Sequence, residues 1–395
     1  MQPCWLFSLR FSRHKIATCL TAPILGGCFT LLLAAAADAQ TDCVAAGRLV
    51  KQGVALGDSS AQEEKLYRDA ISTCPGMAEA HHNLGVLLSR RNEHTLALES
   101  FNKAASLKED VAFYIAVGRV NLELQNNAAA KQAFSKAVEL DARLVPGLQG
   151  LALSTEREGD LDAAVGYLIK AKALDDKSSI TLYNLGVLYE RLQRFEDALA
   201  AYENCLAIDA QHKDALLYAG LTAQRLGQYD KAQQFLSRLT RISPEHAEAQ
   251  QALGVVYEKL GDLDKAELAL RKAVQLDKQN VATQVNLAVV LINKRQESLA
   301  EEVVLKALAI DSTNAWAHGV LGWARLELGK YKEAEAALQK AIELDASDAS
   351  AHNNLGVLYQ RIGKPDEAAR EFKAAVRLDP SLKAAQNNVK EFSQP

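Results

Sequence analysis

The sequence predicts an all-α protein, built as a solenoid of stacked helix pairs, from two observations. Small residues recur with a period of 34 residues, which is the length of two helices with their turns. Aromatic residues make up only 6% of the chain although 49% of its 395 residues are hydrophobic. The core must therefore consist largely of Ala and Leu side chains, a composition that favours closely packed helices.

Two rows of small residues carry the period. The eighth position of six consecutive repeats is Gly or Ala: Gly186, Gly220, Gly254, Ala288, Gly322 and Gly356. The twentieth position of seven repeats is Ala: Ala164, Ala198, Ala232, Ala266, Ala300, Ala334 and Ala368. A small residue at the eighth position leaves room where two helices approach closely. A larger side chain there would cost about 1 to 3 kcal/mol through overpacking.

Each repeat is expected to form two helices. In residues 179–212, Leu182, Leu185 and Tyr189 lie at i, i+3 and i+7 on one face of a first helix, and Tyr202 lies on the matching face of a second. The turn between the helices contains a glycine in five repeats: Gly159, Gly227, Gly261, Gly329 and Gly363. Glycine suits the left-handed conformation in which many helices end.

The period, together with the spacing of Leu-Gly, Tyr, Ala and Pro, resembles the tetratricopeptide repeat, a helix-turn-helix unit. The resemblance implies a right-handed α-α superhelical solenoid, with nine repeats over residues 78–382. Their expected bounds are 78–110, 111–144, 145–178, 179–212, 213–246, 247–280, 281–314, 315–348 and 349–382. Residues 40–77 are expected to form a degenerate capping repeat and residues 383–395 a C-terminal solvating helix and tail, because the end faces of a solenoid have no neighbour to cover them.

Residues 1–39 are interpreted as a secretory signal peptide. A basic start with Arg10, Arg13 and Lys15 precedes an uncharged run and an A-x-A cleavage site that ends at Ala39. Two alternatives stay open: the apolar run is long enough to remain as an uncleaved anchor, and the segment that ends at Cys28 resembles a lipidation site. All three interpretations place the rest of the chain outside the cytoplasm. We expect the periplasm of a Gram-negative bacterium.

The charge balance argues against a nucleic-acid partner. Removal of residues 1–39 takes away three cations and one anion and changes the net charge from −4 to −6. A nucleic-acid-binding protein would carry a basic surface instead. The expected partner is a protein or peptide, and a membrane is expected to be contacted only through the N-terminal segment, if that segment is uncleaved or lipidated.

Three further rows of residues are regular although packing does not require them. Asn occupies the sixth position of four repeats: Asn83, Asn184, Asn286 and Asn354. Val occupies the ninth position of five: Val86, Val187, Val255, Val289 and Val357. A cation occupies the thirteenth position of six: Arg90, Arg157, Arg191, Arg225, Lys259 and Arg361. Spacing alone shows only that each row is stacked repeat over repeat.

The resemblance implies that the first helices line a concave groove and that these rows contact a bound peptide. An asparagine can donate to and accept from an extended peptide backbone at the same time, and arginines can pair with carboxylates through two hydrogen bonds. Solvated asparagines, valines packed between helices and ordinary surface charges remain the alternatives. A grip on the C-terminal carboxylate of heat-shock chaperones is not expected, because no repeat has the required lysine at the fifth and asparagine at the ninth position.

Three cysteines follow the predicted signal peptide. Cys43 and Cys74 lie at the start of the first helix and the end of the second helix of the degenerate repeat. These two ends are neighbours in an antiparallel hairpin, so a disulfide is expected in an oxidising compartment, with two free thiols as the alternative. Cys205 occupies a position that is Ala in other repeats and is expected to be a small buried residue.

No catalytic residue, metal site or cofactor is predicted. The sequence has no P-loop, HExxH, GxSxG or CxxC motif. His81, His318 and His352 share the fourth position of their repeats but lack the further ligands of a metal site. Trp316 and Trp323 form an aromatic spot that either packs or contacts a protein.

The expected function is therefore a non-enzymatic scaffold for protein–protein interactions in the bacterial cell envelope, with extended segments or partner surfaces bound in the concave groove. The alternative function is a regulatory or adaptor subunit of an envelope enzyme or of a secretion or assembly complex. A self-associating structural solenoid is a third interpretation.

Overall fold

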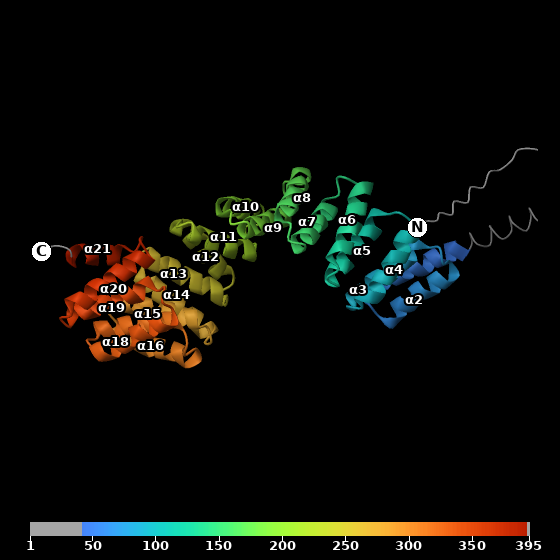
Figure 1. The fold of residues 1–395 in the computed structure, drawn as a ribbon. Coiled ribbons are helices and arrows are strands. Elements are labelled where there is room, and N and C mark those ends of the chain that lie inside the picture. Colours follow the sequence, from blue (N-terminus) through green and yellow to red (C-terminus); the bar gives the residue numbers. More distant parts are fainter. Residues whose placement is uncertain (1–41, 393–395) are drawn as a thin grey trace, which may run out of the picture. The chain divides into compact units, whose positions relative to one another are not determined.

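The structure, a computed structural model, describes residues 42–392 and contains helices but no strand over that range. The chain divides into two compact units, residues 1–158 and 159–395. Within each unit, successive helices lie side by side in antiparallel pairs (Figure 1). The prediction of an all-α solenoid of helix pairs is confirmed. The predicted signal peptide and residues 393–395 lie outside the described residues.

The first unit begins with a helix over residues 42–56. It continues with α2 (Ala61–Thr73), α3 (Ala78–Arg90), α4 (His94–Leu107), α5 (Val111–Glu123), α6 (Asn127–Leu140) and α7 (Val145–Arg157). The helix pair predicted for residues 145–178 is divided between the units, because α7 belongs to the first unit and the helix that follows it belongs to the second.

The second unit continues the alternation of 14-residue and 13-residue helices as far as α20 and ends with the 10-residue helix α21. It contains α8 (Leu161–Leu174), α9 (Ser179–Arg191), α10 (Phe195–Ile208), α11 (Lys213–Arg225), α12 (Tyr229–Ile242), α13 (Ala247–Lys259), α14 (Leu263–Leu276), α15 (Val281–Asn293), α16 (Glu297–Ile310), α17 (Ala315–Glu327), α18 (Tyr331–Leu344), α19 (Ala349–Arg361), α20 (Pro365–Leu378) and α21 (Lys383–Phe392). The first helices of this unit start at the predicted repeat bounds, where polar N-caps such as Ser178, Asn280 and Asp348 accept hydrogen bonds from first-turn N–H groups.

The first helices of successive pairs form a layer of their own. In the first unit α3 contacts α5 and α5 contacts α7. In the second unit contacts run from α11 through α13, α15 and α17 to α19. Within each unit, second helices such as α4, α6, α10 and α18 pack against their own first helix and against the first helix of the next pair. The first helices thus form one layer from α3 to α7 in the first unit and another from α11 to α19 in the second.

The eighth-position glycines lie where two helices of one pair come closest. A Cβ atom on Gly356 of α19 would lie 2.7 Å from Cδ1 of Phe372, which is completely buried on α20. A Cβ atom on Gly85 of α3 would lie 2.7 Å from Cδ1 of Phe101 on α4. Each glycine thus accommodates a large side chain of the second helix, and the packing reason predicted for this row is confirmed.

The turns between paired helices adopt the left-handed conformation whether or not they contain glycine. The five predicted glycines have positive φ, for example 71° at Gly227. Asn92, Gln125, Gln193 and Arg295 occupy corresponding turns in other pairs with φ near 60°. The geometry of the hairpin sets this conformation. A residue other than glycine at this position destabilises the fold, because its Cβ atom is crowded in the left-handed conformation.

Replacement of Gln193 by glycine is expected to raise the free energy of unfolding by about 0.5 to 1 kcal/mol. A left-handed conformation costs a residue with a Cβ atom about 1 to 2 kcal/mol, and the additional entropy that glycine loses on folding removes part of the gain. Gly227 lies 34 residues further on in the same turn, so Gly227→Gln is the matched reverse exchange and should lose a similar amount. Urea unfolding measures the free energy of unfolding of both variants. If both exchanges change it in the same direction, the left-handed conformation is not the cause.

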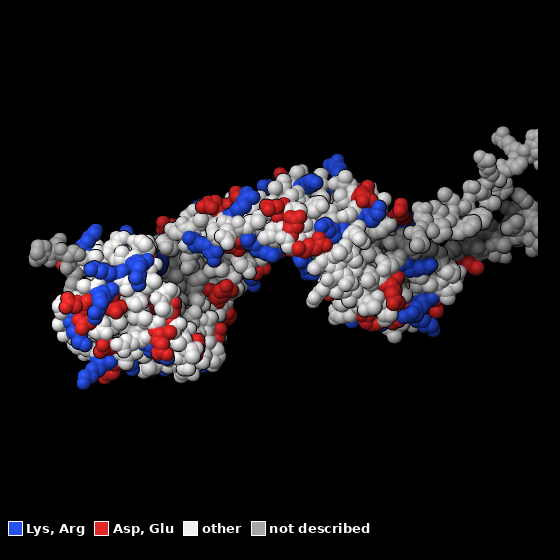
Figure 2. Space-filling view, viewed as in Figure 1, with Lys and Arg blue, Asp and Glu red and all other residues white. Residues whose placement is uncertain are grey.

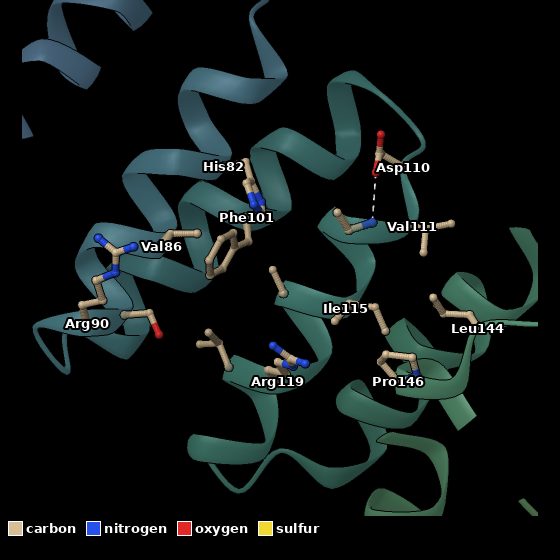
Figure 3. A pocket seen from close by; sticks show the side chains of 14 residues that line it. His82, Val86, Arg90, Phe101, Asp110, Val111, Ile115, Arg119, Leu144 and Pro146 are labelled. Atoms are coloured by element: carbon tan, nitrogen blue, oxygen red, sulfur yellow. Dashed lines mark hydrogen bonds between the residues drawn. The ribbon is translucent and has the colours of Figure 1, made fainter. Parts of the chain in front are cut away.

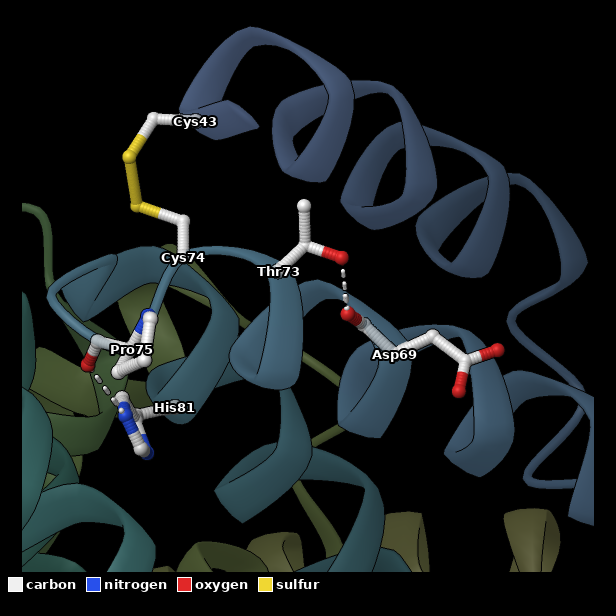
Figure 4. The surroundings of a disulfide bond; sticks show 6 residues. All are labelled: Cys43, Asp69, Thr73, Cys74, Pro75 and His81. Carbon is white, nitrogen blue, oxygen red and sulfur yellow. Dashed lines mark hydrogen bonds between the residues drawn. A yellow bond between two sulfur atoms is a disulfide. The ribbon is translucent and has the colours of Figure 1, made fainter. Parts of the chain in front are cut away.

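The degenerate repeat is joined by a disulfide between Cys43 and Cys74, whose Cα atoms are 5.0 Å apart. Figure 4 shows the bond linking the start of the first helix to the end of α2. Arg91 also holds the repeat to its neighbour, because its side chain donates to the carbonyl oxygens of Ser59 and Ser60 at 2.8 and 2.7 Å. Two attachments, one covalent and one through hydrogen bonds, thus secure the N-terminal pair.

Over residues 42–392, none of the helices combines the length and the apolar character needed to cross a bilayer.

Candidate functional site

A groove in the second unit is lined by the first helices α13, α15, α17 and α19 and by the start of α21. We call it the Trp groove and define it by Val255, Asn286, Val289, Trp316, Trp323 and Asn354. Its cavity has a volume of about 520 Å³. These residues come from four successive repeats, so the stacking of first helices brings together side chains that are up to 99 residues apart in the sequence.

Two of the three predicted rows meet in the Trp groove. Asn286 and Asn354 of the sixth-position row and Val255 of the ninth-position row line it, and all three are half-buried. No hydrogen bond within the described part of the chain uses the amide of Asn286 or Asn354, so both are available to a ligand. Asn184 of the same row is also half-buried but does not line this cavity.

The ninth-position row combines packing with exposure. Val187 and Val289 pack against the hydrophobic clusters beneath them while remaining half-buried. Val357 does the same near the C-terminal end and does not line the Trp groove. In the eighth full repeat the ninth position is Trp323, which continues the apolar row of Val255 and Val289 along the groove.

Several cations of the thirteenth-position row bind the protein itself. Nη1 of Arg157 donates to the carbonyl oxygen of Leu122 at 2.7 Å, and Nη1 of Arg361 donates to that of Leu326 at 3.2 Å. These carbonyls lie at the C-terminal end of the preceding first helix, where the helix dipole favours a positive charge. Each carbonyl also accepts a backbone N–H of the following turn, from Gln125 and Gly329, at 3.1 Å. Arg157 and Arg361 therefore hold adjacent repeats together.

The remaining cations are distributed differently. The Arg225 guanidinium lies 4.7 Å from the ring centroid of Phe195, and Arg191 is exposed. Lys259 lines the Trp groove, with its Nζ 3.0 Å from Oε2 of Glu258. Figure 2 shows basic and acidic side chains interspersed on the visible face of each unit, so neither unit presents a surface of one sign there.

A second cavity lies in the first unit, between α3, α5 and the start of α7. We call it the N-terminal cavity; it has a volume of about 660 Å³ and is lined by Val86, Arg90, Ile115, Arg119 and Leu144 among others. Figure 3 shows Arg90 and Arg119 on the lower side of this cavity. Val86 and Arg90 belong to the ninth-position and thirteenth-position rows, whereas Ile115 and Arg119 depart from the row patterns and were not predicted. Asn83 does not line the cavity, and its Nδ2 donates to the carbonyl oxygen of Glu79.

His82 forms part of the wall of the N-terminal cavity. Its ring lies 4.9 Å from the Phe113 ring and 5.3 Å from the Phe101 ring, measured between centroids. Burial lowers the pKa of His82, because the charged form loses its hydration there. The imidazole is therefore a neutral aromatic packing residue at pH 7.

Sequence reasoning missed two residues that shape the Trp groove, Gly319 and Asp348. Gly319 occupies the fifth position of its repeat, where every other full repeat has a side chain. This exception was visible in the sequence. Asp348 is the N-cap of α19, and its Oδ1 accepts from the N–H of Ala351 at 3.0 Å. Its proximity to Gly319 depends on how α19 stacks on α17.

The donor groups of the described residues do not assemble into a metal site. No cluster of three or more His, Cys, Asp or Glu residues suited to a metal ion occurs over residues 42–392. The Trp groove and the N-terminal cavity instead combine apolar side chains with polar and charged ones.

Family comparisons identify the repeat. Residues 320–383 match a family model described as "Tetratricopeptide repeat", and residues 78–111 and 111–143 match another model with the same description. Residues 148–266 match "Cilia and flagella-associated protein 70 middle TPR-like domain".

Curated proteins match over limited stretches. Anaphase-promoting complex subunit 3 of Schizosaccharomyces pombe is 25% identical over 139 residues, which cover 35% of this chain and 21% of that protein. Protein O-mannosyl-transferase TMTC3 of Homo sapiens is 26% identical over 182 residues, covering 36% of this chain and 20% of that protein. The matches thus span about a fifth of the length of these relatives.

Solved structures share the fold. A tetratricopeptide repeat protein from Parabacteroides merdae aligns with a TM-score of 0.54 at 19% identity, over 63% of this chain and 99% of that one. The APC/C hetero-tetramer Cut9-Hcn1 aligns with a TM-score of 0.50 at 15% identity, over 90% of this chain and 89% of that one. The chain therefore contains tetratricopeptide repeats, which are of the kind that mediates protein–protein interactions or assembly.

Proposed function

We propose that this protein is an exported, non-enzymatic scaffold that binds an extended segment of a partner protein along the Trp groove. The observation that carries the proposal is the meeting of Val255, Asn286 and Asn354 in one cavity. These residues belong to two rows for which the resemblance implies peptide contact, and they come from three different repeats.

The chemistry of the groove suits an extended chain. The amides of Asn286 and Asn354 can each donate to a peptide carbonyl and accept from a peptide N–H. Val255, Val289 and Trp323 provide apolar surface between them. Because backbone contacts read little sequence, the amides would supply affinity while the apolar and aromatic side chains would select the segment.

The site of action that we propose is the envelope of a Gram-negative bacterium. This part of the proposal rests on the basic start, apolar run and A-x-A site of residues 1–39. The disulfide between Cys43 and Cys74 fits an oxidising compartment.

Site-specific photocrosslinking in the native host tests the proposed function. A benzophenone amino acid at position 289 is expected to capture a partner protein, whereas the same residue at position 268 should not. Leu268 on α14 is 73% exposed and does not line the groove, so it controls for accidental contact with neighbours.

A second pair of variants examines the amides. Asn286→Ala combined with Asn354→Ala should reduce the crosslink at position 289 at least tenfold, since two backbone contacts would be lost at about 1 kcal/mol each. Asn204→Ala, on the exposed surface of α10, should leave it unchanged. Equal capture at positions 289 and 268, or capture that ignores both asparagines, would refute groove binding.

A further inference from the structure

Gly319 is a glycine inside helix α17 that packing does not require. A Cβ atom there would lie 3.4 Å from Oδ2 of Asp348 and 3.8 Å from Cβ of Ala341, which are ordinary contact distances. Three residues further on, a Cβ atom on Gly322 would lie only 2.5 Å from Cγ of Leu338. The fold therefore needs glycine at position 322 and accommodates alanine at position 319.

A glycine in the interior of a helix has a thermodynamic cost. Relative to alanine, it loses more backbone entropy on folding and destabilises the helix. The fifth position of the other full repeats always has a side chain: His82, Ile115, Gln149, Tyr183, Leu217, Gln251, Val285 and Asn353. Since neither packing nor repeat pattern explains Gly319, the space that it leaves is the feature to explain.

This space forms a notch between two tryptophans. Trp316, Gly319 and Trp323 lie at i, i+3 and i+7 along one face of α17, and all three line the Trp groove. The two indole side chains start about 10 Å apart along the helix axis, at 1.5 Å per residue. Trp316 is 41% exposed. A side chain that enters the notch can therefore pack against aromatic surface on both sides.

The notch also presents a negative charge. The atom nearest to the missing Cβ of Gly319 is Oδ2 of Asp348, whereas Oδ1 is occupied by the N–H of Ala351. No salt bridge among the described residues includes Asp348. The other carboxylate of the groove, Glu258, already has the Lys259 ammonium 3.0 Å away. Asp348 caps α19 and is thus the carboxylate lining this groove that forms no ion pair with a cation of the described residues.

We propose that the notch at Gly319 receives a lysine or arginine side chain of the bound segment. The aliphatic stem of such a residue packs between Trp316 and Trp323, while its cation interacts with the indole faces and pairs with Asp348. An acidic side chain of the bound segment would be repelled by Asp348, and an apolar side chain would leave the charge of Asp348 without an ion pair. This inference rests on the proposed function and specifies the chemistry of the partner.

Peptide selection on the full-length protein tests the proposal. Random twelve-residue peptides displayed on phage are selected on the wild-type chain, and enriched peptides are synthesised. We expect the enriched peptides to share a lysine or arginine at one position. Replacement of that residue by norleucine, which keeps the stem and removes the charge, should weaken binding at least tenfold.

Three variants of the protein locate the basic side chain. Gly319→Gln inserts the side chain found in the same row at Gln149 and Gln251, and should weaken binding at least tenfold by filling the notch. Asp348→Asn should have a similar effect, because asparagine still caps the helix but carries no charge. Gly166→Gln, in a helix where a Cβ atom meets nothing within 4 Å, is the matched control and should bind as wild type.

The outcomes separate this inference from the proposed function. Thermal unfolding of Gly319→Ala should show an unchanged or raised Tm, and Gly319→Gln should unfold cooperatively near the wild-type Tm, which separates its loss of binding from misfolding. Two outcomes would overturn the inference and leave the proposed function standing. In the first, peptide binding is weakened by the Asn286 and Asn354 variants but not by Gly319→Gln. In the second, the enriched peptides share acidic or apolar residues instead of a basic one. Failure to enrich any groove-dependent peptide would overturn both.

Discussion

Replacement of Gly356 by leucine is expected to lower the free energy of unfolding by about 3 kcal/mol, at the upper end of typical overpacking costs. A Cβ atom at this position would lie 2.7 Å from both Cδ1 and Cε1 of Phe372. Phe372 is completely buried and cannot turn away without opening the pair formed by α19 and α20. Either the ring or the helices must shift, and tight interiors resist both movements. Urea unfolding monitored by circular dichroism measures the loss.

The matched control for this exchange is Gly166→Leu on α8. A Cβ atom on Gly166 has no heavy atom within 4 Å, and Leu268, at the corresponding position of a later repeat, is 73% exposed. The same exchange should therefore raise stability there by about 0.5 to 1 kcal/mol, because leucine favours the helix over glycine. Similar destabilisation at positions 166 and 356 would show that close packing is not the cause.

Removal of the disulfide, by Cys43→Ser together with Cys74→Ser, is expected to destabilise the N-terminal helix pair by about 3 to 4 kcal/mol on the chain-entropy model. The bond spans 31 residues of sequence, and the reduced chain gains the conformational freedom of that loop when the pair opens. In a solenoid each repeat contacts only its neighbours, so the loss should be confined to this end.

Hydrogen exchange resolves this local effect. Amides of residues 42–56 and of α2 should exchange about 100 to 1,000 times faster in the double variant, which corresponds to the expected free-energy change. Amides of α17 to α20 serve as the internal control and should keep their rates. Unchanged exchange near the N-terminus would show that the contacts of Arg91 alone hold the first pair in place.

The sixth-, ninth- and thirteenth-position rows show which features of the site could be predicted from the sequence. The period of the rows placed Asn286, Asn354 and Val255 on one helix face, and the structure brings these three into one cavity. The thirteenth-position cations have the same period, yet Arg157 and Arg361 bind carbonyl oxygens of the preceding first helix. A period shows which residues share a row, but it does not distinguish a side chain that points into the groove from one that reaches back to a neighbour.

The sequence by itself determined the helical class, the positions of the helix pairs and the need for small residues at the eighth position, because a 34-residue period and helical spacing are properties of the chain alone. It also drew attention to Cys43 and Cys74, through their places at the two ends of a hairpin. Only the tertiary structure decided that Asp348 lies beside Gly319. That proximity depends on how far one repeat turns relative to the next, and the packing of whole helices sets this turn.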